Sequence, residues 1–131
     1  MLDHVDLKNV LQISQSVNPQ VVTASVDGGG VDLRDCESEV LVLVSVGDVT
    51  ALVASVKLQQ SLNDNTSSNE AAAEAYADID GASVTPTFAD NTPVSFKVDT
   101  RGKRFVRAVV TFTSGTGVVG VTVISAKRIL G

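Results

Sequence analysis

Alternating apolar positions dominate the chain and predict β-strands. Valine occupies every second position in 40–46, and the positions between include Leu41 and Leu43. Because successive residues of a strand point to opposite faces, this segment has two largely apolar faces. We therefore expect 40–46 to be a central strand, covered on each side by protein or by a neighbouring subunit.

The last third of the chain has the same character. In 104–113 the even positions after Arg104 are apolar, and 118–129 is again rich in valine. The Ser-Gly-Thr-Gly sequence at 114–117 predicts a hairpin turn between these strands. Its glycines also match the dinucleotide-binding spacing Gly-x-Gly-x-x-Gly at 115–120, but that chemistry needs a helix after the first glycines, and here a strand pattern continues.

Shorter strands are expected elsewhere. We predict extended segments at 10–17 and 20–26 with a turn at Asn18-Pro19, a strand at 51–60 after a turn at Gly47-Asp48, and edge strands at 83–88 and 93–98, whose prolines cannot donate to a ladder. Three glycines at 28–30 favour a tight reversal or a close backbone approach. A capping-box pattern, Ser67 with Glu70, predicts one short helix near residues 70–77.

A repeated phrase indicates how the strands are arranged. Val-Asp-Leu-Arg at 31–34 and Val-Asp-Thr-Arg at 98–101 each precede a strong strand, so the chain reads as two related halves. Valine, threonine and isoleucine, which favour sheet, make up 39 of the 131 residues. We predict an all-β fold, an antiparallel β-sandwich that is jelly-roll-like, with an immunoglobulin-like order as the alternative. Residues 1–19 are expected to form an N-terminal arm and lead-in, and 20–131 one sandwich domain.

Charge is distributed unevenly along the chain. The formal net charge is −5, yet residues 101–131 carry six bases and no acid. These bases either attract an acidic partner or pair across the sheet with Asp32, Asp35, Glu37, Glu39 or Asp99. The negative overall field and the scarcity of aromatic residues argue against nucleic-acid binding.

Catalytic and metal-binding patterns are weak. His4 is the single histidine and lies in the expected arm, and Asp78-x-Asp80-Gly81 begins like a calcium loop but lacks its later ligands. The single cysteine, Cys36, is expected to be a buried apolar residue. We find no signal-like segment and no apolar run of the roughly 20 residues that cross a bilayer. The sequence therefore predicts no enzyme, cofactor, metal site, membrane partner or small-molecule substrate.

Several short motifs support a family resemblance. They are Val-Asp-Leu-Arg at 31–34, Val-Lys-Leu-Gln-Gln-Ser at 56–61 followed by Asn63-Asp64, Gly-Lys-Arg-Phe-Val-Arg-Ala at 102–108, and Val-Ile-Ser-Ala-Lys-Arg-Ile-Leu-Gly at 123–131. Over about residues 31–131 the chain resembles the small β-rich capsid decoration, or cement, proteins of tailed bacteriophages. Phe105 stands where that group commonly has tyrosine, and the alanine-rich 70–77 segment replaces a loop with aspartates.

The resemblance implies a non-catalytic virion protein that is made in the host cytoplasm, binds the major capsid protein on the outside of an assembled head and stabilises it, as an expected homotrimer. We expect capsid or subunit contacts from two groups, the apolar arm residues and the bases next to the repeated phrase: Leu2, Val5, Leu7, Val10, Leu11, Arg34, Arg101, Lys103 and Arg104. For Arg34 and Arg101, bridging to loop carbonyls or acids is the alternative to direct shell contact. The arm could equally be an ordinary first strand with a frayed tip.

Two other functions stay open at this level. One is a head-to-tail joining or tail component, and the other is a non-catalytic ligand-binding sandwich such as a sugar-binding module. The absence of tryptophan and the single tyrosine argue against the sugar-binding alternative.

Overall fold

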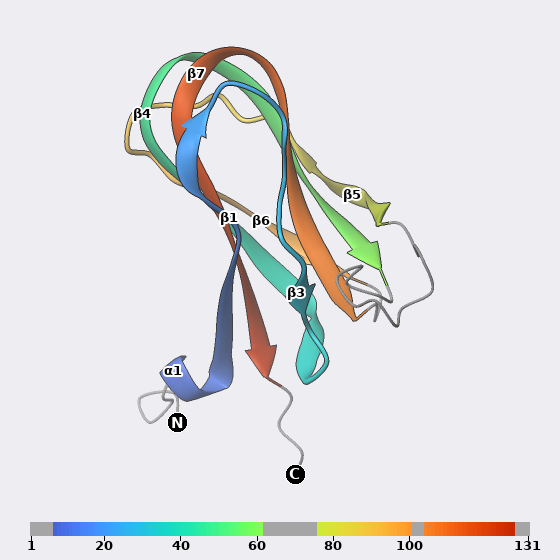
Figure 1. Cartoon of the computed structure of the whole chain (residues 1–131). Helices are drawn as coiled ribbons and strands as arrows, with labels where there is room; N and C mark the ends of the chain where they lie inside the picture. Colours follow the sequence, from blue (N-terminus) through green and yellow to red (C-terminus); the bar gives the residue numbers. More distant parts are fainter. Residues whose placement is uncertain (1–6, 62–75, 101–103, 128–131) are drawn as a thin grey trace.

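The chain folds as one antiparallel sheet that is bent over on itself. A computed structural model describes residues 7–61, 76–100 and 104–127 (Figure 1). The elements are α1 (Leu7–Val10), β1 (Leu11–Val22), β2 (Val26–Asp27), β3 (Val31–Asp32), β4 (Cys36–Ser61), β5 (Ala77–Val84), β6 (Val94–Asp99) and β7 (Phe105–Lys127). The prediction of an all-β antiparallel sandwich is confirmed.

Two long strands, β4 and β7, run through both layers of the sandwich. They pair with each other from Cys36↔Lys127 to Ser61↔Phe105 and bend together near their middles, which produces the rounded top seen in Figure 1. Layer A contains β1, the second half of β7, the first half of β4 and β6. Layer B contains β2, β3, the first half of β7, the second half of β4 and β5.

We call the shared bend, residues 47–53 of β4 with 114–117 of β7, the arch. Register shifts on the β4 side fall between Val46 and Val49 and between Thr50 and Val53. Gly115 has φ 79° and Ala51 has φ 50°, and a Cβ on Gly115 would collide with the Ala51 carbonyl. Bulges and a glycine increase local bending without ending a strand.

The arch corrects two predicted turns. The expected turn at 47–48 and the expected hairpin loop at 114–117 are bends inside continuous strands. The predicted hairpin between 104–113 and 118–129 is wrong, since these halves of β7 lie in opposite layers and pair with opposite halves of β4. Glycine permits either a reversal or a bend, and the neighbouring strand that bends with it decides between them.

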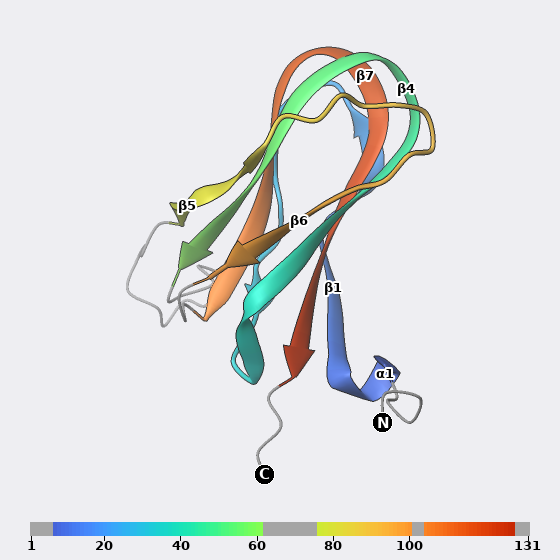
Figure 2. The same ribbon diagram turned by 180° about the vertical axis from the view of Figure 1, so that it is seen from behind.

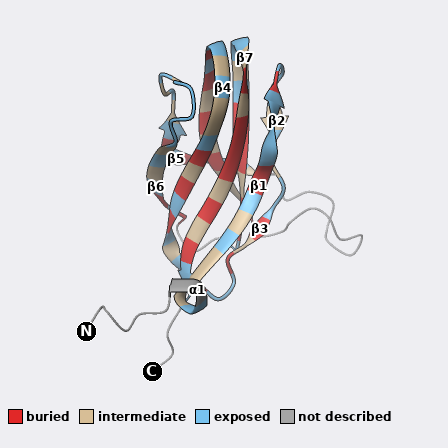
Figure 3. Cartoon of the chain, turned by 90° about the vertical axis from the view of Figure 1, so that its left-hand side faces the viewer, coloured by how far each residue is buried: buried red, intermediate tan, exposed pale blue. Residues whose placement is uncertain are grey.

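The core between the layers is aliphatic. Inward residues alternate along each long strand, including Val42 and Val56 in β4 and Val110 and Val121 in β7, all fully buried. Figure 3 shows these alternating bands on the neighbouring strands β4 and β7. Valine brings stiff side chains to this interface and packs closely with leucine, so the core needs no aromatic residue at its centre.

The strand pairing repeats within the chain. β3 pairs with the first half of β7 and β6 with the first half of β4, while β1 pairs with the second half of β7 and β5 with the second half of β4. After each Val-Asp pair, the next amide donates to the facing strand: Leu33 to the Arg104 carbonyl at 2.7 Å and Thr100 to the Ser38 carbonyl at 2.8 Å. The repeated phrase therefore marks two topologically equivalent positions.

The N-terminal segment differs from expectation around Pro19. β1 continues through Asn18 and Pro19 with a register shift between Val17 and Gln20, so the predicted turn is a bulge on an edge strand, where proline is tolerated. β1 also crosses the expected boundary between arm and sandwich at residue 19. In the arm, α1 is a helix of 4 residues.

Two other predictions concern the second half of the chain. Residues 70–75 of the expected short helix lie outside the described residues, and Ala77 begins strand β5. The predicted strand at 83–88 is wrong in position, since β5 ends at Val84 and Pro86 follows it outside any strand, whereas the strand predicted at 93–98 is found as β6. Both β5 and β6 lie at sheet edges, as expected. None of the helical structure in the described ranges has the length and apolar character that spanning a membrane requires.

Candidate binding surfaces

The expected contact residues that the structure describes gather at one end of the sandwich. We call the end opposite the arch the open end; α1, the turn after β3 and the start of β7 all lie there (Figures 1 and 2). Leu7 and Val10 belong to α1, and Leu11 begins β1. Val10 and Leu11 are half-buried, whereas Arg34 and Arg104 are exposed. Leu2, Val5, Arg101 and Lys103 lie outside the described residues.

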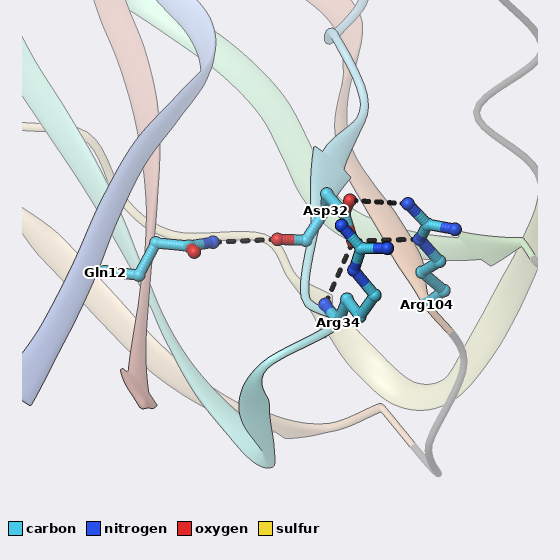
Figure 4. A network of polar contacts seen from close by, with 4 residues as sticks. All are labelled: Gln12, Asp32, Arg34 and Arg104. Atoms are coloured by element: carbon cyan, nitrogen blue, oxygen red, sulfur yellow. Dashed lines mark hydrogen bonds and ion pairs between the residues drawn. The ribbon is translucent and has the colours of Figure 1, made fainter. Parts of the chain in front are cut away.

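Asp32 organises the polar contacts of the open end (Figure 4). The Arg104 guanidinium donates to both carboxylate oxygens, from Nε at 3.1 Å and from Nη2 at 2.9 Å. The backbone amide of Arg34 donates to the same carboxylate at 2.9 Å, and Gln12 Nε2 donates to the Asp32 carbonyl at 2.8 Å. The Arg104 guanidinium also lies 4.7 Å from the centre of the Phe105 ring.

This geometry lowers the pKa of Asp32. The Arg104 hydrogen bonds are the main cause, and the Arg34 amide and the charges of both arginines act in the same direction, while partial burial opposes them. The prediction that the C-terminal bases pair with acids such as Asp32 is confirmed for Arg104. For Arg34, the hydrogen bond comes from the backbone and the guanidinium lies beside the carboxylate, as Figure 4 shows.

Ser16 joins the two layers along the β1 edge, a role that the sequence did not reveal. Its hydroxyl donates to the Gly29 carbonyl at 2.8 Å and accepts from the Ala108 amide at 2.8 Å, and its carbonyl accepts from the Gly29 amide at 2.7 Å. A Cβ on Gly28 would lie 2.6 Å from the Ala108 carbonyl. The predicted close backbone approach at the glycine triplet is confirmed, although its partner Ser16 had no local signal.

The outer side of layer B carries an internally paired polar network, next to the buried Phe105 and Val109. Asp78 accepts from Gln59 Nε2 at 2.8 Å and forms an ion pair with Lys57 at 3.0 Å. Arg107 Nε donates to Gln59 Oε1 at 2.9 Å, and its guanidinium lies 4.5 Å from the centre of the Tyr76 ring. The Gln59 hydrogen bond, followed by that of Lys57, lowers the pKa of Asp78. We call this set the polar face.

The outer face of layer A carries four aliphatic residues among polar ones. Cross-strand pairing aligns two rows from β1 to β6, and we call them together the aliphatic face: Ile13, Ile124, Leu41 and Lys97, and then Gln15, Thr122, Leu43 and Ser95. Ile13 is 64% exposed and Leu41 is 37% exposed. No described element of the chain covers this face. The central strand is thus buried on its inner side, as predicted, while its outer side faces solvent in the single chain.

Pockets and metal-ligating side chains provide little evidence for a further binding site among the described residues. A shallow open groove of about 420 Å³ lies beside the arch, lined by Ala51, Leu52, Val53 and residues 85–88. Within 7–61, 76–100 and 104–127, no group of three or more metal-ligating side chains occurs. The glycines at 115 and 117 lie inside strand β7, so no helix N-terminus follows them to meet a phosphate. Cys36 is buried as expected, and His4 lies outside the described residues.

Comparison with known proteins provides a fold relative. No protein-family model and no curated protein sequence matches the chain. The crystal structure of the SPBc2 prophage-derived protein YomS is similar, with a TM-score of 0.50 and 17% sequence identity over 90% of this chain and 96% of that chain. The two proteins therefore share a fold over nearly their whole lengths.

Proposed function

We propose that the chain is a structural virion protein of a tailed bacteriophage, and specifically a decoration protein that binds the outside of an assembled head. Two independent observations support a phage role. The fold is shared with a prophage-derived protein, and the motifs at 31–34, 56–61, 102–108 and 123–131 resemble those of capsid decoration proteins. The proposed partner is the major capsid protein, and the proposed location is the capsid surface.

The observation that carries the proposal is the clustering at the open end. α1, the Arg34 turn and the Arg104 strand start come from three distant parts of the chain and lie at the same end of the sandwich (Figure 2). Arg104 is held by Asp32 and by the Phe105 ring, so its position is fixed before any partner arrives. Preorganised side chains lose less conformational freedom on binding. This end is therefore the surface that we assign to the shell.

The proposed role depends on adhesion and needs no bond-making chemistry. A decoration protein stabilises a shell when it binds the assembled form more tightly than the dispersed subunits. A sandwich whose layers share two continuous strands is a rigid body that can deliver such contacts without folding on binding. We accordingly propose that the chain is not an enzyme and takes no cofactor.

Co-sedimentation with purified heads of the phage that encodes the chain tests the proposal. The purified chain is mixed with expanded heads, and the bound copies per head are measured by gel densitometry. Hundreds of copies support decoration, whereas about a dozen or fewer would place the chain at one vertex, as a head-to-tail component, and contradict decoration. No binding contradicts both roles.

A matched pair of variants tests the open end. Arg34→Gln removes an exposed positive charge there and should reduce the number of bound copies, while Thr111→Glu makes the same one-unit change in net charge at an exposed position in layer B and should bind like the unmodified chain. Equal binding by the two variants would remove the open end as the contact surface. Circular dichroism of both variants confirms that they are folded.

A further inference from the structure

We propose that the peptide between Asp80 and Gly81 is a site of spontaneous isoaspartate formation. The sequence contains two Asp-Gly pairs, Asp27-Gly28 and Asp80-Gly81, and both lie within the described ranges. In this backbone modification, the nitrogen of the glycine attacks the side-chain carboxyl carbon of the aspartate. The surroundings of the two pairs decide which of them can react in the folded chain. This inference does not depend on the proposed virion role.

The reaction needs no partner other than water. The Gly81 nitrogen bonds to the side-chain carboxyl carbon of Asp80, and the nitrogen's proton leaves with the carboxyl hydroxyl as water, so that a cyclic succinimide forms. Water then adds to either imide carbonyl and breaks the bond from that carbon to the nitrogen. One product is the original aspartate. The other is isoaspartate, in which the main chain runs through the former side chain and is longer by one methylene group. Nothing is oxidised or reduced.

Residues 79–82 bulge out of the ladder between β4 and β5. Lys57 pairs with Ser83 and Gln59 pairs with Asp78, so the β5 residues 79–82 lie opposite Leu58 alone. Asp80 and Gly81 have no register partner, and both are exposed. The extra residues of a bulge are left out of the regular pairing of the strands. The peptide between Asp80 and Gly81 can therefore rotate without breaking a ladder pair.

Gly81 leaves room for the ring to close. Its φ is 77°, and beyond its chain neighbours no heavy atom lies within 4 Å of the position that a Cβ would occupy. Glycine also has no side chain that would hinder the approach of its nitrogen to the carboxyl group. β5 is an edge strand that pairs with β4, and no other described strand pairs with its outer side.

The Asp80 side chain is free to turn toward Gly81. The nearby Asp78 carboxylate is held by Gln59 at 2.8 Å and by Lys57 at 3.0 Å. The Asp80 carboxylate, by contrast, makes no hydrogen bond or ion pair with any residue of the described ranges. An unrestrained carboxylate samples several rotamers, including those that bring its carbon to the following backbone nitrogen.

The Asp27-Gly28 pair has the opposite surroundings. Asp27 pairs with Val109 in the sheet, and the Gly28 amide donates to the Ala108 carbonyl at 2.7 Å. A Cβ on Gly28 would collide with the Ser16 hydroxyl, so the peptide has no room to rotate. A nitrogen that is hydrogen-bonded and enclosed can reach the carboxyl carbon only after local unfolding. The fold therefore exposes one Asp-Gly pair to the reaction and protects the other.

Incubation of the purified full chain at neutral pH for several weeks tests the site. Isoaspartate is measured with an isoaspartyl carboxyl methyltransferase and a labelled methyl donor, and fragmentation mass spectrometry of the peptides locates it. A parallel sample is kept unfolded in urea, where neither pair is protected. The folded chain should contain severalfold more isoaspartate at residue 80 than at residue 27, whereas the unfolded chain should contain similar amounts at both.

Matched variants identify the source of the signal. Asp80→Glu keeps the charge but requires a larger ring, which closes far more slowly, so the methyl-accepting signal of the folded chain should disappear. Asp27→Glu is the control and should leave that signal unchanged. Three results would overturn the proposal: a folded chain that forms no isoaspartate, equal amounts at residues 27 and 80 in the folded chain, or a signal that persists in Asp80→Glu. Circular dichroism confirms that both variants are folded.

Discussion

The two outer faces of the sandwich differ although they are built by the same strands. β4 and β7 contribute to both, yet layer A presents Ile124 and Leu41 where layer B presents Arg107 and Gln59. The inner sides of both layers are equally aliphatic and buried. The inward pattern is therefore what folding requires, and the outward pattern is free to serve contacts with other molecules.

The internal repeat sharpens this contrast. The strands of the two layers correspond, with β1 equivalent to β5 and β4 equivalent to β7 in their pairing. An equivalent backbone thus supports outward-facing aliphatic residues in one layer and a paired polar network in the other. Predictions that change matched residues in the two environments can separate folding from association.

The largest effect is expected from leucine truncation in the core. Leu58→Ala removes a fully buried side chain and should lower the free energy of unfolding by about 2–5 kcal/mol. Leu41→Ala should cost less, about 1–2 kcal/mol in the monomer, because Leu41 is 37% exposed and the truncation leaves no enclosed cavity. Urea unfolding of both variants at low protein concentration measures the difference. Similar losses would show that the aliphatic face supports the fold of the single chain.

The next effect concerns the link between the layers. Ser16→Ala removes the hydroxyl that accepts from the Ala108 amide and donates to the Gly29 carbonyl. A buried amide left without its acceptor should cost about 1–3 kcal/mol. Ser83→Ala, at an exposed position, is the matched control and should be neutral. Thermal unfolding of the two variants measures the difference in stability. Equal melting temperatures would contradict the structural role of Ser16.

A smaller effect, dependent on pH, is expected at the open end. The pKa of Asp32 is lowered in the folded chain, so its ion pair stabilises the fold above the ordinary carboxyl pKa of about 3.9 and this contribution is lost as pH falls through the folded value. The side chains of Asp32 and Arg104 are 41% and 43% exposed, which limits the gain at neutral pH to about 0.2–1 kcal/mol.

Asp32→Asn should therefore be less stable than the unmodified chain at neutral pH and match it in acid. Chemical unfolding at several pH values measures the convergence, and a constant difference would contradict the assignment. Asp78→Asn on the polar face should behave in the same direction but more weakly, because Asp78 is fully exposed.

The smallest effect on folding is expected at Ile13. Ile13→Thr keeps a β-branched side chain in edge strand β1 and should change the free energy of unfolding of the monomer by less than about 0.5 kcal/mol. Ile79→Thr, the same substitution facing the core, should be clearly destabilising because it buries a hydroxyl. Unfolding measured at low concentration isolates the monomer. A large loss at Ile13 would mean that this residue contributes to the fold itself.

The sequence predicted the local pattern well and the long-range geometry less well. The alternating valines at 40–46 identified the central strand, the repeated phrase identified two related halves, and the uneven charges predicted that Arg104 would meet an acid such as Asp32. The sequence predicts turns at residues 47 and 115, where the structure has bends, because glycine permits either a turn or a bend. Only the continuous antiparallel pairing of β4 with β7 through both layers settles the choice.

The residues of the candidate surfaces are also hard to predict where their role depends on long-range geometry. Ser16 forms hydrogen bonds with Gly29, 13 positions away, and with Ala108, 92 positions away, so no local sequence pattern could identify it. The aliphatic face emerges only when four strands are aligned in register, since Ile13 and Ile124 are ordinary strand residues when viewed along the chain. Ile13 and Ile124 differ from the buried Ile79 in their exposure to solvent, which depends on the fold and is not visible in the sequence.

The position of β7 also has a consequence for synthesis on the ribosome. This strand lies between partners in both layers, and it is made after all the other described strands. Until it emerges, β1, β2 and β3 lack the strand with which they pair, whereas β4 can already pair with β5 and β6. The two layers can therefore be completed only after translation of β7, and a nascent chain that stops before Phe105 has only the pairs that β4 makes with β5 and β6.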